Sequence, residues 1–120
     1  MYPVHEIRLQ SQFKPLRAND RYQKIRPMTL IVGDELLDYA KSITDRSEFE
    51  YFLRCLVADY RINYRQWENL DLLSYLQGLS EFVPDIDGYY ANAGEEVDTE
   101  QPSWRLIAEM LIAASVYGNY

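Results

Sequence analysis

The stretch DIDGYYANAGEE, residues 85–96, gathers the residues whose types and spacing are best suited to binding a ligand. Its two aspartates invite comparison with a calcium loop, because Ca²⁺ prefers carboxylate and carbonyl oxygens. If Gly88 took the glycine position of an EF-hand loop, Val83 would occupy the first ligand position and Gly94 the last, bidentate one. Neither residue can supply a side-chain oxygen, so we do not expect an EF-hand.

Two other interpretations of this stretch stay open. In the first, Asp85 and Asp87 are paired carboxylates that face the same side of an extended backbone and bind a metal ion or act as acid and base. This alternative predicts a cation-dependent or carboxylate-based enzyme centred on those two residues. In the second, Pro84 ends a helix, and the glycines at 88 and 94 allow positive φ in a polar loop.

The sequence has few of the residues and motifs that other common kinds of catalysis need. The sequence contains one histidine, His5, and one cysteine, Cys55, so it cannot build a zinc site from these residue types. A Cys–His pair would require the N-terminal segment to fold back onto Cys55. Neither GxxxxGK[ST] nor GxGxxG is present. We therefore assign no catalytic residue, expect no cofactor, and favour a protein that is not an enzyme.

Charge is distributed unevenly along the chain and bears on the choice of partner. The net charge is −7, but residues 1–27 carry six Lys and Arg against two acids, while the rest carries six against seventeen. An acidic body opposes binding to nucleic-acid phosphates, except through the basic N-terminal segment. It favours a basic protein partner. We expect no membrane insertion and a cytoplasmic location, since no apolar run of about 18 residues and no signal peptide are present.

The leading hypothesis is a non-catalytic protein-binding module, such as an antidote or immunity-type protein that covers a basic surface of its partner. Eleven tyrosines and two tryptophans could supply contact area in an interface. The acidic, tyrosine-rich surface predicted for that role consists of Tyr89, Tyr90, Asn92, Glu95 and Glu96. A homodimer formed through an exposed helical stripe is a further alternative.

The pattern of apolar residues predicts an all-α fold: a small single-domain bundle of about four helices with an irregular N-terminal arm. Residues 1–27 form a basic extension, either flexible or docked, and residues 28–120 form the helical domain. Helices are expected within 34–43, 44–67, 68–88 and 102–120, the last ending at Gly118. The longest should bury two stripes, the third should end near Phe82, and the last should be central because it is apolar almost all round.

Five more specific expectations concern particular residues. Asn69 is a candidate N-cap of the third helix, and Gly78 indicates close packing against a neighbour. Cys55 should be a small buried side chain. Arg105 and Glu109 should pair four residues apart on the exposed side of the last helix. The core face of the third helix should contain Leu73, Leu76, Leu79, Val83 and Ile86, helped by Leu72 and Phe82.

Residues 67–118 carry three further motifs: WEN at the start, DIDGYYAN in the centre and PSWRLIAEMLIAASVY at the end. They resemble a domain family of unknown function in small bacterial proteins, with the pattern WEN, DxDGYYxN and PSWRLxAxxLxAAxxY. The preceding SEFEYFLRCLVADY is similar to the first long helix of that family. The resemblance covers about residues 34–118 and leaves the N-terminal arm outside. It implies a bacterial origin and carries no activity.

Overall fold

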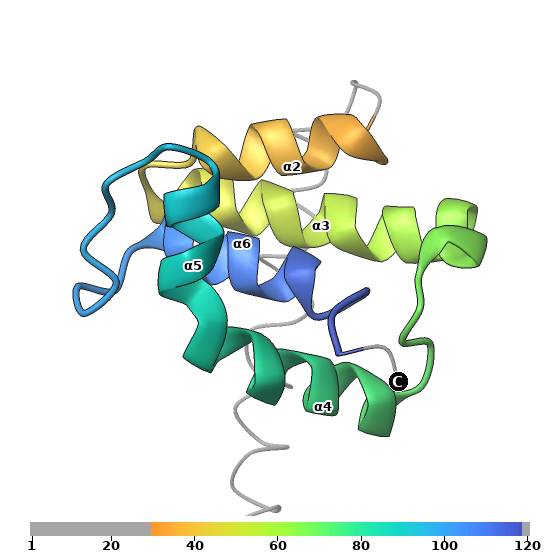
Figure 1. Ribbon diagram of the computed structural model, residues 1–120. Coiled ribbons are helices and arrows are strands. Elements are labelled where there is room, and N and C mark those ends of the chain that lie inside the picture. Colours follow the sequence, from red (N-terminus) through yellow and green to blue (C-terminus); the bar gives the residue numbers. More distant parts are fainter. Residues whose placement is uncertain (1–29, 119–120) are drawn as a thin grey trace, which may run out of the picture.

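The last helix, which is the most apolar, lies at the centre of the molecule. The computed structural model describes residues 30–118, so the predicted arm 1–27 and its His5 lie outside the described residues. Helix α6, Trp104–Ala113, contacts α2, α3 and α4 and lies between α3 and α4 in Figure 1. Its first turn is capped by Ser103, whose Oγ accepts a hydrogen bond from the Leu106 amide at 3.0 Å. The predicted central position is confirmed.

The other elements surround α6 and are all helical within residues 30–118. They are α2 Asp34–Lys41, α3 Arg46–Asn63, α4 Leu72–Phe82 and α5 Ile86–Asn92, with 3₁₀ turns at Tyr64–Gln66 and Val83–Asp85. This part of the chain contains no strand. The predicted all-α bundle is therefore confirmed. None of these helices is both long enough and apolar enough to cross a membrane.

The core consists of two clusters that meet along α6. The first joins α2 and α3 to α6 and contains Leu36, Ala40, Ile43, Phe52, Cys55 and Ala108. The second joins the end of α4 and α5 to α6 and contains Phe82, Ile86, Tyr90 and Leu106. Cys55 is buried as predicted, and burial raises the pKa of its thiol.

The start of α4 is fixed to the turn that follows α6. The Asn69 amide Nδ2 donates to the carbonyls of Ala114 and Tyr117 at 2.8 and 2.9 Å. The Asn69 backbone amide donates to the Ser115 carbonyl at 2.9 Å. The prediction that Asn69 caps α4 is therefore wrong: Asp71 is the N-cap, and its Oδ1 accepts from the Ser74 amide at 2.7 Å.

This attachment also explains why the predicted core face of the third helix is only partly right: Phe82 and Ile86 are buried as predicted, but other positions are not. Gly78 packs directly against the turn after α6, so the Gly78 and Phe82 side of the helix is buried. Four leucine and valine positions expected in the core are exposed instead: Leu72, Leu73, Leu76 and Val83. On α3 one stripe is buried through Phe52, Cys55 and Ala58, whereas Leu53, Val57, Tyr60 and Ile62 are exposed.

Residues 86–92 form helix α5. One of the two interpretations of the stretch 85–96 had placed a polar loop here. The regular part of α4 ends at Phe82 as predicted, and Pro84 lies in the first turn of the 3₁₀ segment. A proline there removes no hydrogen bond that the helix needs, so the chain continues into α5. Gly88 is consequently helical, and only Gly94 of the two loop glycines has a positive φ, +75°.

Replacement of Gly78 by alanine should destabilise the fold. A Cβ at this position would lie 2.5 Å from the Ala114 carbonyl oxygen and 2.6 Å from Asn69 Nδ2. Because one of these atoms is backbone, we expect Gly78→Ala to lower the free energy of unfolding by about 1–3 kcal/mol. Urea denaturation followed by circular dichroism measures this.

The matched control is Gly88→Ala, because a Cβ on Gly88 meets nothing within 4 Å. That variant should be as stable as the wild type or more stable by up to about 1 kcal/mol, since alanine favours a helix over glycine. Equal stability of the Gly78→Ala variant and the wild type would contradict the close approach of α4 to the turn.

Candidate functional site

The most unusual group in the described structure is the carboxyl group of Glu109 in the middle of α6. Its side chain is fully buried, and the residue as a whole is 1% exposed. The Tyr89 hydroxyl donates to Glu109 Oε2 at 3.0 Å, and the Tyr90 hydroxyl donates to Oε1. Arg105 Nε donates to Oε1 at 3.1 Å. A buried carboxyl group is tolerated only when it is paired and hydrogen-bonded in this way.

Arg105 links this buried group to the surface. Its Nη2 contacts Glu95 Oε1 at 2.6 Å, and its guanidinium carbon lies 5.5 Å from the centre of the Tyr90 ring. The predicted Arg105–Glu109 pair is thus present, but the prediction that it lies on the exposed side of α6 is wrong. Glu109 faces α5, because the two tyrosines of α5 offer hydroxyl groups that satisfy its carboxyl oxygens.

The network changes the ionisation of its members in definite directions. Burial, reinforced by the hydrogen bonds and negative charge of Glu109, raises the pKa of Tyr89 and that of Tyr90 well above their ordinary values. Burial alone would lower the pKa of Arg105, but its hydrogen bonds to Glu95 and Glu109 raise it overall. The two phenols therefore stay protonated as donors over a wide pH range.

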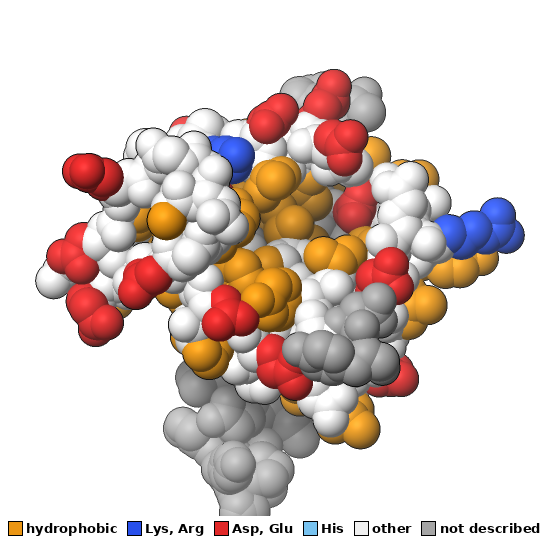
Figure 2. Space-filling model, viewed as in Figure 1, with side chains coloured by type: hydrophobic (Ala, Val, Ile, Leu, Met, Phe, Trp, Pro, Cys, Tyr) orange, Lys and Arg blue, Asp and Glu red, His pale blue; other side chains and the backbone are white. Residues whose placement is uncertain are grey.

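A pocket of about 630 Å³ opens beside this network, between α2, α5 and the end of α6. Its walls are mainly apolar, and they are formed by Leu37, Phe82, Pro84, Ile112, Ala113 and Val116. Figure 2 shows this face as a hollow with hydrophobic side chains inside, and with acidic side chains and a Lys or Arg side chain around it. Gly88 also borders the pocket, and its missing side chain leaves room there. The volume is in the range of small-molecule sites.

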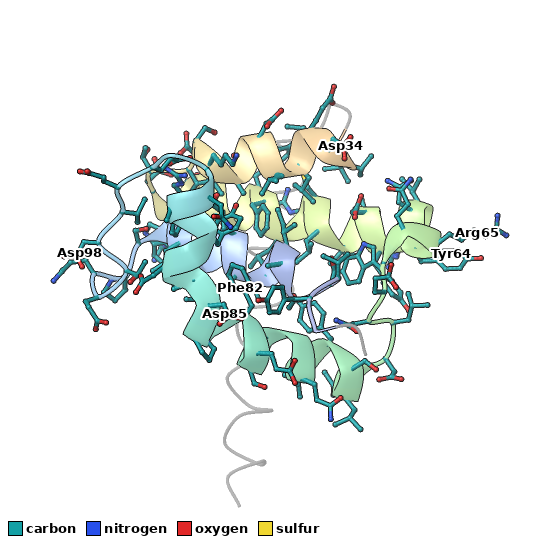
Figure 3. The ribbon with its side chains drawn as sticks, viewed as in Figure 1. Asp34, Tyr64, Arg65, Phe82, Asp85 and Asp98 are labelled. Carbon is teal, nitrogen blue, oxygen red and sulfur yellow. The ribbon has the colours of Figure 1, made fainter. Side chains whose placement is uncertain are left out.

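The polar groups of the pocket are acidic or neutral. Asp85 is exposed at its edge, beside Phe82 at the junction of α4 and α5 (Figure 3), and its Oδ2 accepts a hydrogen bond from the Tyr117 hydroxyl. Asn92 also borders the pocket, while Glu109 lies at its base. No Lys or Arg is among the described residues that line it. The pocket therefore combines apolar walls with an unbalanced negative charge.

Asp87 does not share the position of Asp85. Its Oδ1 accepts a hydrogen bond from Thr99 Oγ1 at 2.6 Å, in the loop before α6, whereas Asp85 contacts the turn after α6. The expectation that both aspartates face one side is wrong, because the backbone here is helical and not extended. Within residues 30–118, no group of three or more His, Cys, Asp or Glu side chains is placed to hold a metal ion.

The five residues predicted to form a partner-binding surface are in different environments. Tyr90 is buried, Tyr89 is half-buried, and both contact Glu109. Glu95 is half-buried against Arg105. Asn92 and Glu96 are exposed, and of these Asn92 borders the pocket. The structure thus gathers Tyr89, Asn92 and Asp85 around one pocket and assigns Tyr90 and Glu95 to the network beneath it.

Sequence reasoning missed the central role of Glu109 and the contribution of Tyr117. A signal was present for the first, because Glu109 is an isolated acid in a helix that is otherwise apolar and therefore central. A charge in such a helix must be either exposed or paired inside. No comparable signal pointed to Tyr117, whose position depends on the turn after α6.

The raised pKa values of the two phenols predict a loss of stability in alkali. In the unfolded chain a tyrosine loses its proton near pH 10, whereas in the folded protein Tyr89 and Tyr90 keep theirs. The folded state then binds more protons than the unfolded state, so the free energy of unfolding falls as pH rises above about 10. The buried Tyr90 phenol should contribute about 1.4 kcal/mol of this loss by about pH 11, and the half-buried Tyr89 phenol should contribute less.

Urea denaturation from about pH 8 to about pH 11 measures the slope. A Tyr90→Phe variant should show a shallower loss than the wild type, because it lacks one of the phenols. A wild-type stability that does not change over this range would contradict the buried, protonated state of these groups.

A comparison with family models identifies the domain. The model of a family of unknown function (DUF7660) matches residues 45–118, more than half of the chain. The match starts at Asp45, the N-cap of α3, and not near residue 34, so α2 lies outside it. Neither the comparison with curated proteins nor the comparison with solved structures gives a match. The chain belongs to the family of unknown function DUF7660.

Proposed function

We propose that this protein is a non-catalytic binding module whose pocket receives a positively charged group on an apolar stem. Lys and Arg side chains of a basic partner protein have this chemistry. The single observation that carries the proposal is the composition of the pocket: apolar walls, Asp85 at the edge, Glu109 at the base and no lining Lys or Arg.

The charges around the pocket favour a cation. Asp85 and Glu109 line the pocket, and Arg105, the base that pairs with Glu109, also pairs with Glu95 outside the lining. Because one guanidinium cannot balance three carboxylates, the site has a net negative charge in a largely apolar setting, where electrostatic attraction is stronger than in water. The exposed Asp85 is the group that a ligand can reach directly.

The pocket also suits a ligand that carries its positive charge on an apolar chain better than it suits a bare ion. Phe82, Ile112 and Val116 offer apolar contact to methylene groups. The hydrogen bond from Tyr117 to Asp85 holds the carboxyl group in place and leaves its other oxygen, Oδ1, for a ligand. An amine or guanidinium at Asp85 with its chain along the apolar wall would use both features.

The direct test titrates the ¹⁵N-labelled protein with n-hexylammonium, n-hexanol and n-hexanoate and follows amide chemical shifts. The ammonium should bind at least about tenfold more tightly than the alcohol or the anion, and the shifts should map to α5 and the end of α6. Asp85→Asn should remove that preference while keeping the acceptor for Tyr117. A preference for hexanoate, or shifts that map elsewhere, would refute the proposal.

Two variants that add side chains of similar size test whether the ammonium binds in the pocket or elsewhere on the acidic surface. Gly88→Leu adds a side chain where a Cβ meets only open space, so it should block the pocket without disturbing the core. Ala91→Leu makes a similar change at an exposed position of α5 that does not line the pocket. Only the first variant should lose ammonium binding.

The source of the charged group is tested with short peptides that carry one Lys or Arg. Peptide binding that Gly88→Leu abolishes would support a protein partner. Binding of hexylammonium without binding of any such peptide would leave the pocket assignment intact and refute the protein-partner part of the proposal.

A further inference from the structure

A second surface of the molecule, formed by α3 and α4, exposes more apolar side chain than a single solvated domain needs. Seven large apolar residues are 38–72% exposed there: Leu53, Val57, Tyr60, Leu70, Leu72, Leu73 and Leu76. The most exposed are Leu72 and Leu73 on the first turn of α4. We refer to these seven residues as the α3–α4 face. Four of them, Val57, Tyr60, Leu70 and Leu72, line one groove, and exposed apolar surface gathered in this way usually marks an interaction site.

The face also contains a groove. It encloses about 320 Å³ and is lined by Leu56, Val57, Tyr60, Trp67, Leu72 and Tyr75, among others. Its aromatic side chains form a connected row: the Tyr60 and Trp67 rings are 5.1 Å apart, and the Trp67 and Tyr75 rings are 6.0 Å apart. Hydrogen bonds hold this row, from Trp67 Nε1 to Asp59 at 2.8 Å and from the Tyr75 hydroxyl to the Leu111 carbonyl at 2.7 Å. The groove is therefore preformed.

We infer that a second copy of this chain docks on the α3–α4 face, related to the first by a twofold axis. Such an interface must be complementary to itself, because each copy presents the same patch. The α3–α4 face satisfies this requirement in shape, since it carries both a groove and protruding leucines. Leu73 and Leu76 of one copy can enter the groove of the other, and the reverse contact follows from the symmetry.

The charges on the face satisfy the same requirement. The groove is bordered by one base, Arg61 on α3, and one acid, Asp71 at the start of α4, and both are exposed. A twofold arrangement can place Arg61 of each copy against Asp71 of the other, so two complementary pairs form and no like charges meet. The groove lining has no excess of acidic side chains that would favour a basic partner protein over a second copy. This proposal is independent of the pocket, which lies between α2, α5 and the end of α6.

Sedimentation of the full chain over about 1–200 μM, a range in which interfaces of ordinary size associate, tests the proposal. The wild type should form a dimer with a concentration-dependent midpoint. Leu73→Glu/Leu76→Glu should raise the dissociation constant by at least about tenfold. Ile62→Glu, a similar change at an exposed residue on the opposite side of α3 from Leu53, should leave it unchanged. A wild type that stays monomeric throughout, or a dimer that the double variant leaves intact, overturns the proposal.

A charge-exchange experiment distinguishes this geometry from loss of folding. Arg61→Glu and Asp71→Lys should each weaken self-association, because each places like charges together twice. An equal mixture of the two variants should form a mixed dimer, in which both pairs are again of opposite charge. Circular dichroism verifies that α4 survives the loss of its Asp71 cap. Failure of two folded variants to associate on mixing overturns the pairing.

Discussion

The arrangement of α5 against α6 depends on one buried carboxyl group. Glu109 has no access to water, so its oxygens must be satisfied by the protein, and the hydroxyls of Tyr89 and Tyr90 together with Arg105 do this. These contacts require α5 to run across α6 with its tyrosines facing inward. Removing one partner would leave an uncompensated polar group in the interior, which is costly.

The same requirement accounts for the pocket. With α5 held against α6 by its tyrosines, the Gly88 side of α5 faces open space, and the end of α6 together with Leu37 of α2 closes the other sides. The turn after α6 supplies Tyr117 and is itself held by Asn69 and by the close approach of Gly78. Two separate polar anchors, one in the middle of α6 and one at the turn after it, thus fix the walls of one cavity.

Local sequence signals predicted the elements better than the faces they present. The end of α4 near Phe82 and the central position of α6 follow from short-range rules of proline placement and periodicity. Short-range rules do not predict which side of α4 is buried. That side is set by contacts of Asn69 and Gly78 with residues about 40 positions away in the sequence. Leu73 and Leu76 were therefore expected in the core and are exposed.

For the candidate site, too, the sequence indicated the segment but not the long-range contacts that shape it. The stretch 85–96, which the sequence analysis singled out for ligand binding, borders the pocket through Asp85, Gly88, Tyr89 and Asn92. The sequence does not reveal the contact between Tyr90 and Glu109, which is about 20 residues away and holds the Tyr90 side chain in the interior. An isolated acid in an apolar helix is ambiguous until a partner with a matching donor is located in space.

The most direct test of this account is a double-mutant cycle between Tyr90→Phe and Glu109→Gln, measured as the free energy of unfolding by urea denaturation. If the two side chains interact as described, their coupling should be about 1–2 kcal/mol, as for contacting members of a hydrogen-bond network. Tyr75→Phe serves as the reference, because its hydroxyl donates to the Leu111 carbonyl and not to Glu109. A Tyr90–Glu109 coupling no larger than that of Tyr75–Glu109 would contradict the central role of the buried carboxyl group.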